Sequence, residues 1–316
     1  MAEQRWVARE FGDVDVLELE TFTPGAVGAG EVLIEVRAVG MNPADLKSFS
    51  GARDPDPALL PLVPGFEVAG VVRELGAETE DHGLRVGDEV LAFRVRAGYA
   101  TAVVTSVANV FRKPANLSFA EAANLLLAST TAADTLNVVR VTEGDVVLVH
   151  GASGSVGLFA TQLARRLGAR VIGTSSAGNR ALVDGMGGVP VEYGPGLLDR
   201  VREITDRVDA AIDCVGTDEA IDVSEALVAD RSRIVTIAAQ RRAAADGLRA
   251  VGGAQPESAA FRDAARPGII ELAADGDLRM PPTRTFPFAD APEALRLLAS
   301  GHPGGKLALE VAESDR

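Results

Sequence analysis

Two patterns of apolar and polar positions divide the chain near residue 118. Before that point, apolar and polar residues alternate over strand lengths at 31–39, 66–75 and 88–93, and Gly and Pro interrupt the runs. This alternation predicts a β-rich domain with a barrel-like or sandwich-like sheet.

After residue 118, strand and helix patterns follow one another. Ser118 and Glu121 have the spacing of a capping box, so a helix is predicted to begin there and to reach about Arg140. Further strands are predicted at 145–150, 170–174, 209–215 and 232–238, with helices at 155–167, 178–187 and 218–229. This repeated alternation predicts a doubly wound parallel sheet, and therefore an α/β fold.

Two other segments have distinct patterns. The Ala- and Arg-rich stretch 241–250 is predicted to be a mobile surface loop. From about Thr283 the pattern changes again, and a short helix at 291–299 and a strand at 306–311 are expected to close the chain.

A glycine-rich turn is the most specific chemical signal. The spacing Ala152-x-Gly154-x-x-Gly157 differs by one alanine from G-x-G-x-x-G, and it lies between a predicted strand and a predicted helix. Glycines let the backbone approach a pyrophosphate, and the start of the helix offers N–H groups to it. This context favours dinucleotide binding over a tight turn alone. The expected contacts are Gly151, Ala152, Ser153, Gly154, Ser155, Val156 and Gly157.

The end of the next strand indicates which nicotinamide nucleotide would bind. An NAD site usually places Asp or Glu there, but this strand ends in Thr174, Ser175 and Ser176. Arg180 follows closely enough to pair with a 2′-phosphate, which favours NADPH over NADH. Alternatively, the serines cap the next helix and Arg180 is solvated or neutralised by Asp184.

Composition limits the partners and the compartment. The 316 residues have a net charge of −14, which disfavours nucleic acid or an anionic membrane as a partner. We expect a cytoplasmic protein, because no run is long and apolar enough to span a membrane and no signal-peptide pattern opens the chain. The single cysteine, Cys214, can form no intrachain disulfide and is predicted to be core. His82, His150 and His302 are too far apart for metal-ligand spacing.

Several motifs occur in one order along nearly the whole chain. They are Val39-Gly40-Met41-Asn42-Pro43-Ala44-Asp45-Leu46-Lys47, Pro61-x-x-Pro64-Gly65-Phe66-Glu67, Gly87-Asp88-Glu89-Val90, the glycine turn, and Gly301-His302-x-x-Gly305-Lys306. This series resembles the medium-chain dehydrogenase/reductase superfamily, and within it the zinc-free, zeta-crystallin-like quinone oxidoreductase branch.

The resemblance implies a fold and the absence of zinc. It implies a GroES-like catalytic domain formed by residues 1–118 and 284–316, and a Rossmann NADPH-binding domain formed by residues 119–283. Zinc alcohol dehydrogenases of the superfamily have Gly-His-Glu where this chain has Gly65-Phe66-Glu67. Because phenylalanine cannot bind a metal, zinc-independent chemistry is expected.

The resemblance also implies site residues. Asn42 and Asp45 would face the nicotinamide, Asn42 donating to a substrate carbonyl and Asp45 orienting a water or a hydroxyl. Lys47 would supply a proton or bind a thioester phosphate, and Tyr99 is a further general-acid candidate. Alternatively, Asn42 starts a turn, Asp45 caps a helix and Tyr99 is structural.

The other cofactor contacts are spread along the predicted Rossmann domain. Thr131 would contact the nicotinamide side, unless it is an ordinary helix threonine. Tyr193 would help to hold the 2′-phosphate. The remaining predicted contacts are Val215, Ala238 and Gly253.

The predicted function is NADPH-dependent reduction of quinones or activated C=C bonds by hydride transfer. The alternatives are an enoyl-thioester or enone reductase of a biosynthetic pathway, and a non-catalytic NADPH-binding sensor or structural protein. By resemblance, a homodimer formed through the segment around 249–254 is expected.

Overall fold

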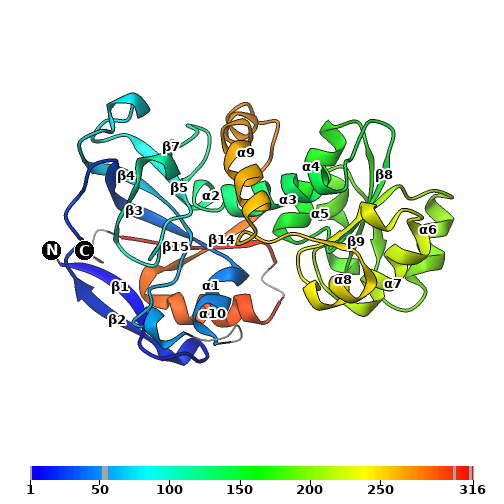
Figure 1. Ribbon diagram of the computed structural model, residues 1–316, viewed down its shortest axis with the longest axis horizontal. Coiled ribbons are helices and arrows are strands. Elements are labelled where there is room, and N and C mark those ends of the chain that lie inside the picture. The colour runs from blue at the N-terminus through cyan, green and yellow to red at the C-terminus, as the bar shows by residue number, and fades with distance from the viewer. Residues whose placement is uncertain (1, 52–55, 302–303, 313–314, 316) are drawn as a thin grey trace. The chain divides into compact units, whose positions relative to one another are not determined.

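The chain folds into two units, each with its own sheet and its own apolar core. Residues 1–127 and 282–316 form the first unit, and residues 128–281 form the second. The structure, a computed structural model, describes residues 2–51, 56–301, 304–312 and 315 (Figure 1). His302, a residue of the last sequence motif, lies outside the described residues.

Antiparallel pairing dominates the first unit (Figure 1). One sheet has the order β14-β15-β3-β4-β5-β7, with β6 paired to β3, and β1 pairs with β2 separately. The strands are β1 (Glu3–Ala8), β2 (Leu17–Phe22), β3 (Glu31–Met41), β4 (Glu67–Leu75), β5 (Glu89–Phe93), β6 (Ala102–Ser106), β7 (Val110–Arg112), β14 (Thr283–Pro287) and β15 (Lys306–Glu310). The helices are α1 (Pro43–Phe49), α2 (Phe119–Ala122) and α10 (Ala291–Ala299).

The last strand, β15, returns to the first unit's sheet, where it lies between β14 and β3. β15 pairs antiparallel with β3, so that Leu309 lies opposite Val39. The capping box predicted at Ser118 is present, but α2 packs against β3, β4 and β15. An added Cβ at Gly40 would lie 1.9 Å from the Ala123 carbonyl oxygen, which shows how closely the chain after α2 approaches β3. This packing explains why the division between the units falls a little after the predicted boundary.

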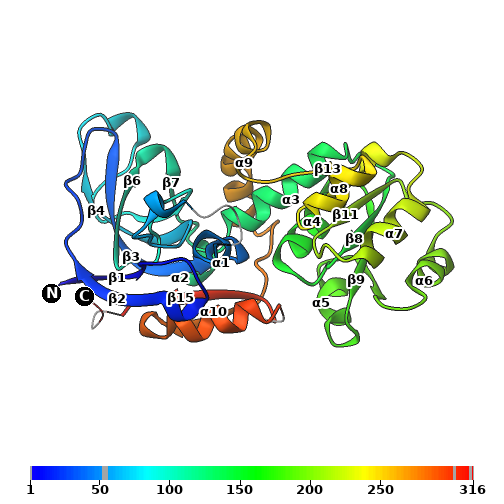
Figure 2. The ribbon, with the colours of Figure 1, turned by 60° about the horizontal axis from the view of Figure 1, so that its bottom comes forward.

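Six parallel strands form the sheet of the second unit, in the order β10-β9-β8-β11-β12-β13. Figures 1 and 2 show helices on both sides of this sheet, which confirms the predicted α/β architecture. The strands are β8 (Val146–His150), β9 (Arg170–Ser175), β10 (Val189–Glu192), β11 (Ala210–Asp213), β12 (Ile234–Thr236) and β13 (Arg249–Ala250). The helices are α3 (Leu126–Val138), α4 (Ser155–Arg166), α5 (Arg180–Gly185), α6 (Leu197–Ile204), α7 (Asp218–Leu227), α8 (Gln240–Asp246) and α9 (Pro256–Ala274).

The helices and strands of this unit pair through their apolar faces. β8 is buried along its whole length, and α4 buries Leu158, Phe159 and Leu163 on one side. None of the helices in the described part of the chain has both the length and the apolar character that a membrane span requires.

The predicted loop at 241–250 is wrong, because most of this segment is α8, which is followed by β13. Ala and Arg are strong helix formers, and α8 buries Ala243. Arg242 also forms ion pairs with Asp218 and Asp222 of α7, while Gly247 ends the helix with φ +72°. The low-complexity composition of this stretch therefore reflects helix propensity.

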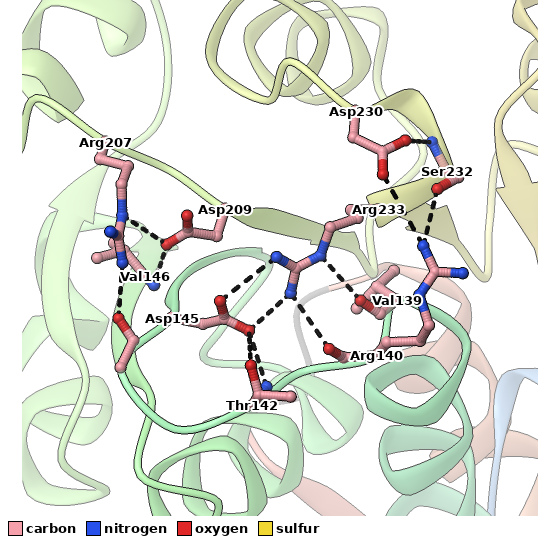
Figure 3. Close-up of polar contacts among 11 residues, drawn as sticks. Val139, Arg140, Thr142, Asp145, Val146, Arg207, Asp209, Asp230, Ser232 and Arg233 are labelled. Carbon is pink, nitrogen blue, oxygen red and sulfur yellow. Dashed lines mark hydrogen bonds and ion pairs between the residues drawn. The ribbon is translucent and has the colours of Figure 1, made fainter.

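A polar network joins the amino ends of the parallel strands (Figure 3). Arg233, just before β12, donates through Nη2 to Asp145 Oδ2 at 2.6 Å and through Nε to the Val139 carbonyl oxygen at 3.1 Å. Partial burial alone would raise the pKa of Asp145, but hydrogen bonds from Arg233 and Thr142 outweigh it and hold that pKa below its usual range. This network ties the end of α3 to the first strand of the sheet.

Replacing Arg233 tests the contribution of this network. Arg233→Gln removes a partly buried ion pair, whose side chains are 20% and 11% exposed, so the free energy of unfolding should fall by about 2–3 kcal/mol. The ionised Asp145 stabilises the fold above its unfolded pKa, and this contribution is lost as the pH falls through its lower folded pKa. The difference in free energy of unfolding between the wild type and Arg233→Gln, measured by urea denaturation, should therefore become smaller below about pH 4.

Arg207 provides a matched control in the same network. Its side chain is 64% exposed and pairs with Asp209 at 3.0 Å (Figure 3). Because exposed ion pairs contribute little, Arg207→Gln should leave the denaturation midpoint nearly unchanged. Equal losses in the two variants would contradict a special role for Arg233.

Candidate functional site

The glycine turn is attached to the carboxyl end of β9. Gly151 has φ +70°, and its N–H donates to Thr174 Oγ1 at 3.0 Å. The N–H of Ala152 donates to the Thr174 carbonyl oxygen at 2.9 Å. Thr174 therefore fixes the turn through both its side chain and its backbone.

Close packing under the turn determines where α4 begins. An added Cβ at Gly157 would lie 2.3 Å from the Gly151 carbonyl oxygen, so only glycine fits there. No side chain caps the start of α4 at Gly154, and the first N–H groups of a helix have no partner within the helix. Backbone donors and a positive dipole end thus meet at Ser153, Ser155 and Val156, an arrangement that fits a pyrophosphate.

Two further loops reach the same edge of the sheet. An added Cβ at Gly151 would lie 2.5 Å from Val215 Cγ1, and one at Gly216 would lie 2.8 Å from Ala238 Cβ. The structure therefore brings together the predicted contacts Gly151, Thr174, Val215 and Ala238.

Asp213 and Thr236 shape these loops, and the sequence analysis did not select them. Asp213 Oδ1 accepts from the N–H groups of Val215 and Gly216, at 2.9 and 2.8 Å. Thr236 Oγ1 donates to Asp213 Oδ2 at 2.6 Å and accepts from the N–H of Ala238. Polar residues that end two buried parallel strands were the signal that could have identified them.

The expected 2′-phosphate region lies around the end of β9. Ser175 is buried, and its carbonyl oxygen accepts from the N–H of Tyr193, whose side chain is exposed. Ser176 precedes a 3-10 turn without capping it through its side chain, and Ser175 Oγ donates to the Ser176 carbonyl oxygen. The capping alternative is therefore not observed.

Arg180 begins α5 with an exposed side chain. No ion pair between Arg180 and Asp184 is present in the part of the chain that the structure describes, so the predicted neutralisation of Arg180 is not observed. Asn179, the residue before it, has its Nδ2 3.5 Å from Ser153 Oγ of the glycine turn. The segment containing Arg180 thus begins beside the turn.

Thr131 and Gly253 lie elsewhere in the same unit. Thr131 is buried on α3, where its hydroxyl accepts a hydrogen bond from Arg262 of α9 at 2.9 Å. Gly253 is exposed in the segment before α9. Their predicted contacts with the nicotinamide stay predictions.

A buried polar cluster lies at the end of β3 in the first unit. Lys306 Nζ donates to Asn42 Oδ1 at 2.6 Å, and Asn42 Nδ2 donates to Glu67 Oε1 at 2.8 Å. Glu67 Oε2 also accepts from the N–H of Leu127 at 3.0 Å. Charged partners therefore bind both the oxygen and the nitrogen of the Asn42 amide. Of the two Nδ2 hydrogens, one is used in the bond to Glu67.

Asp45 and Tyr99 complete this cluster, whereas Lys47 does not join it. Asp45 Oδ2 accepts from the Asn42 N–H at 2.7 Å and from the Tyr99 hydroxyl at 3.2 Å. Asp45 and Tyr99 are fully buried. Lys47 is exposed on α1, and no hydrogen bond links it to the cluster among the described residues.

Burial dominates the pKa values of this cluster. It raises the pKa of Asp45 to about 7, with Glu67 adding to the rise, against the lowering effects of the Asn42 N–H, Lys306 and Tyr99. Burial first, and then Asp45, raise the pKa of Tyr99 well above its usual value. Tyr99 therefore keeps its proton at neutral pH, and burial lowers the pKa of Lys306 against the pull of Glu67 and Asp45.

Cys214 and His150 have structural surroundings. Cys214 is half-buried directly after β11, so the prediction that it lies in the core is only partly met; burial of the thiol, and then Asp213, raise its pKa, which makes it a poor nucleophile. Burial lowers the pKa of His150 to about 4, so its ring is neutral and contacts Ser224 Oγ at 3.1 Å.

The donor set of the first unit does not fit zinc. Phe66 stands where a histidine ligand would be needed, and Glu67 is already paired with Asn42 and Lys306. Across the described residues, no group of three or more His, Cys, Asp or Glu side chains could hold a metal ion.

Comparison with known proteins places these features in context. Residues 28–125 match the alcohol dehydrogenase GroES-like domain, and residues 191–309 match a family described as zinc-binding dehydrogenase. The tomato 2-methylene-furan-3-one reductase is 35% identical over 68% of this chain. An Arabidopsis thaliana chloroplastic NADPH-dependent alkenal/one oxidoreductase is 29% identical over 96% of this chain and 78% of its own length.

Solved structures extend the likeness to the whole chain. The quinone oxidoreductase from Coxiella burnetii has a TM-score of 0.83 and 29% identity, over 99% of this chain and 100% of the other. In contrast, the match with the tomato reductase spans only 57% of that protein.

The pH dependence of stability tests the state of Asp45. Its pKa is raised in the fold, so the folded state binds the proton more tightly, and this group's contribution to stability is lost as the pH rises from about 4 to about 7. Asp45→Asn keeps an acceptor for Asn42 and Tyr99 but cannot ionise. Relative to the wild type, the free energy of unfolding of Asp45→Asn should increase by on the order of 4 kcal/mol as the pH rises from about 4 to about 7, as measured by urea denaturation.

The exposed carboxyl of Asp290 in the same unit is the control. Asp290→Asn should follow the wild type at every pH. A constant difference between Asp45→Asn and the wild type would show that Asp45 titrates normally.

Proposed function

Since this chain belongs to the quinone oxidoreductase branch of the medium-chain dehydrogenase/reductase superfamily, we propose that it is an NADPH-dependent reductase of quinones or activated C=C bonds. One observation supports this most directly: the glycine turn is fastened to a β9 strand that ends in Thr174 and Ser175, with no acid. The Arabidopsis relative is described as NADPH-dependent, which agrees with this assignment of the cofactor.

The second unit would hold the cofactor through its own polar groups. The start of α4 would face the pyrophosphate, while Ser175, Ser176, Arg180 and Tyr193 would bind the 2′-phosphate. Asp213 and Thr236 would keep Val215 and Ala238 in place beside the turn. The bound nicotinamide supplies the hydride.

The first unit would orient the acceptor. Lys306 and Glu67 fix the Asn42 amide, whose remaining Nδ2 hydrogen could then donate to a substrate carbonyl. Asp45 and Tyr99 are fully buried, so we assign them a supporting role. Asp45 accepts from the Asn42 N–H and keeps the turn at Asn42 in place, and the Tyr99 hydroxyl donates a hydrogen bond to Asp45. Because no zinc site fits, polarisation of the carbonyl would come from hydrogen bonds. The exposed Lys47 stays a candidate proton source.

The hydride acceptor distinguishes a quinone reductase from a reductase of enones, enals or enoyl thioesters. The tomato and Arabidopsis relatives are described as reductases of a furanone and of alkenals or enones, and the Coxiella protein is a quinone oxidoreductase. NADPH oxidation should therefore be followed with quinones, 2-enals and enoyl thioesters. The fastest acceptor identifies the substrate class, whereas binding without turnover would favour a sensor or structural role.

Location and other partners are proposed from the sequence. The net charge of −14 favours a small-molecule substrate over nucleic acid or a membrane surface, and a cytoplasmic location agrees with a single, unreactive cysteine.

Replacing Arg180 tests the choice of cofactor. If its guanidinium binds the 2′-phosphate, Arg180→Met should raise KM for NADPH by about 10- to 100-fold and leave KM for NADH unchanged, because one charge-assisted hydrogen-bond pair is lost. Arg202→Met, which removes an exposed arginine of α6, is the control and should change neither value. A wild-type preference for NADH would overturn the assignment.

The homodimer is proposed from the family resemblance. β13, which contains Arg249 and Ala250, lies at one edge of the parallel sheet, so this is the edge at which a second copy would pair. Light scattering after gel filtration should give about twice the mass of 32.8 kDa. A monomer mass at micromolar concentration would contradict this prediction.

A further inference from the structure

One face of α9 contains polar residues that are almost completely buried. Ser258, Arg262 and Arg266 follow one another at intervals of four residues, so they lie on the same side of the helix. Their exposed fractions are 6%, 6% and 4%. Buried arginines are uncommon and need partners, so this face indicates a built contact.

The partners of Arg262 lie one turn apart on α3. Arg262 Nε donates to Asp134 Oδ2 at 2.9 Å, and its Nη1 donates to Thr131 Oγ1 at 2.9 Å. The Ser258 hydroxyl donates to the same Asp134 oxygen. All four residues are at most 6% exposed. We call Thr131, Asp134, Ser258 and Arg262 the α3–α9 network.

The chemistry of the guanidinium makes this network directional. Arginine is donor-only, so the Thr131 hydroxyl must act as the acceptor in their bond. Asp134 fixes the guanidinium plane through Nε, and that plane aims Nη1 at Thr131. The Thr131 side chain is thus held by a group whose own orientation is determined by a buried carboxylate.

Arg262 also lies beside a second predicted cofactor segment. An added Cβ at Gly253 would be 3.6 Å from its Nη1, which is ordinary contact distance. The same guanidinium nitrogen therefore touches Thr131 on α3 and borders the segment before α9. Both were predicted from the sequence to contact the cofactor, whereas nothing in the sequence had selected Arg262.

Stability alone does not explain a buried ion pair. Desolvation costs offset most of its Coulomb attraction, and an apolar pair of similar volume often stabilises a fold as well. What a fork-shaped donor offers beyond an apolar residue is a fixed geometry for the groups it binds.

We propose that Arg262, which lies beside Gly253, is a positioning residue that holds Thr131 in the geometry that receives the nicotinamide half of NADPH. This inference rests on the proposed function. It assigns a role to the α3–α9 network that is separate from binding of the 2′-phosphate and the pyrophosphate.

Two ligands separate this role from general folding. NADPH contains the nicotinamide, whereas 2′,5′-ADP contains only the adenosine part with its phosphates. The test variant is the double substitution Asp134→Leu with Arg262→Leu, which removes both charges and leaves no buried carboxylate unpaired. Thr131→Val removes the hydroxyl alone.

The expected result is a selective loss. In the double variant, Kd for 2′,5′-ADP should stay within about twofold of the wild type, while Kd for NADPH rises about tenfold, as expected for loss of one buried hydrogen-bonding geometry. The fluorescence emission of bound NADPH should move toward that of the free cofactor. Thr131→Val should have a similar effect, and adding it to the double variant should change Kd for NADPH by less than about twofold.

Arg262→Lys and Arg233→Gln are the matched comparisons. Lysine keeps the charge but lacks the fork, so Arg262→Lys should retain part of the stability and still weaken NADPH binding. Arg233→Gln breaks an Arg–Asp pair at the amino ends of the strands, so it should lower the thermal midpoint without altering the emission of bound NADPH.

Three outcomes would overturn the proposal. Unchanged NADPH affinity and emission in a folded double variant would show a purely structural pair. Equal losses for NADPH and 2′,5′-ADP would show that the network supports the whole unit. If the folded wild type binds neither ligand, the proposed function fails, and the role of Arg262 fails with it.

Discussion

The contact between Gly157 and the Gly151 carbonyl oxygen is the constraint on which the second unit depends. Only a residue without Cβ lets the start of α4 approach the end of β8 so closely. Because of this close approach, the N–H groups at the start of α4 lie beside the glycine turn. Thr174 accepts a hydrogen bond from that turn and so holds it to β9. The positions of Val215 and Ala238 follow, because the Asp213 carboxylate and Thr236 hold their loops against the same turn. A substitution of Gly157 would therefore disturb the whole carboxyl edge of the sheet.

Buried charge is used in both units to fix the orientation of neutral polar groups. In the first unit, Lys306 and Glu67 bind opposite sides of the Asn42 amide. In the second, Arg262 donates both to the Asp134 carboxylate and to the Thr131 hydroxyl. Since burying these charges yields little net stability, their value lies in holding an amide and a hydroxyl in one arrangement.

Local pattern was sufficient for the fold and for the position of the glycine turn. Period-two alternation located β3 and β4, and the glycine motif located the turn between β8 and α4. The residues that the sequence analysis missed each have a partner distant in the sequence: Thr236 donates to Asp213, and Arg262 donates to Asp134. In the sequence, for example, Arg262 has the pattern of an ordinary helix residue. Only the structure shows that it contacts Asp134 and Thr131 of α3. The loop prediction for 241–250 was wrong because it took an Ala- and Arg-rich composition as a sign of a loop, although these residues favour a helix; ion pairs of Arg242 with α7 accompany that helix.

The contacts of Glu67 in the first unit show why the donor set at this position does not fit zinc. Glu67 remains, but its charge is balanced by the Lys306 ammonium, 3.6 Å away, and not by a bound cation. Phenylalanine at position 66 cannot bind a metal, and Glu67 Oε1 accepts a hydrogen bond from the Asn42 amide. A fixed ammonium cannot polarise a substrate oxygen as an open metal site does, because its hydrogen-bonding positions are taken by protein oxygens. Hydrogen bonds would then be the means of polarising a carbonyl in this unit, which agrees with the electrophilic acceptors proposed above.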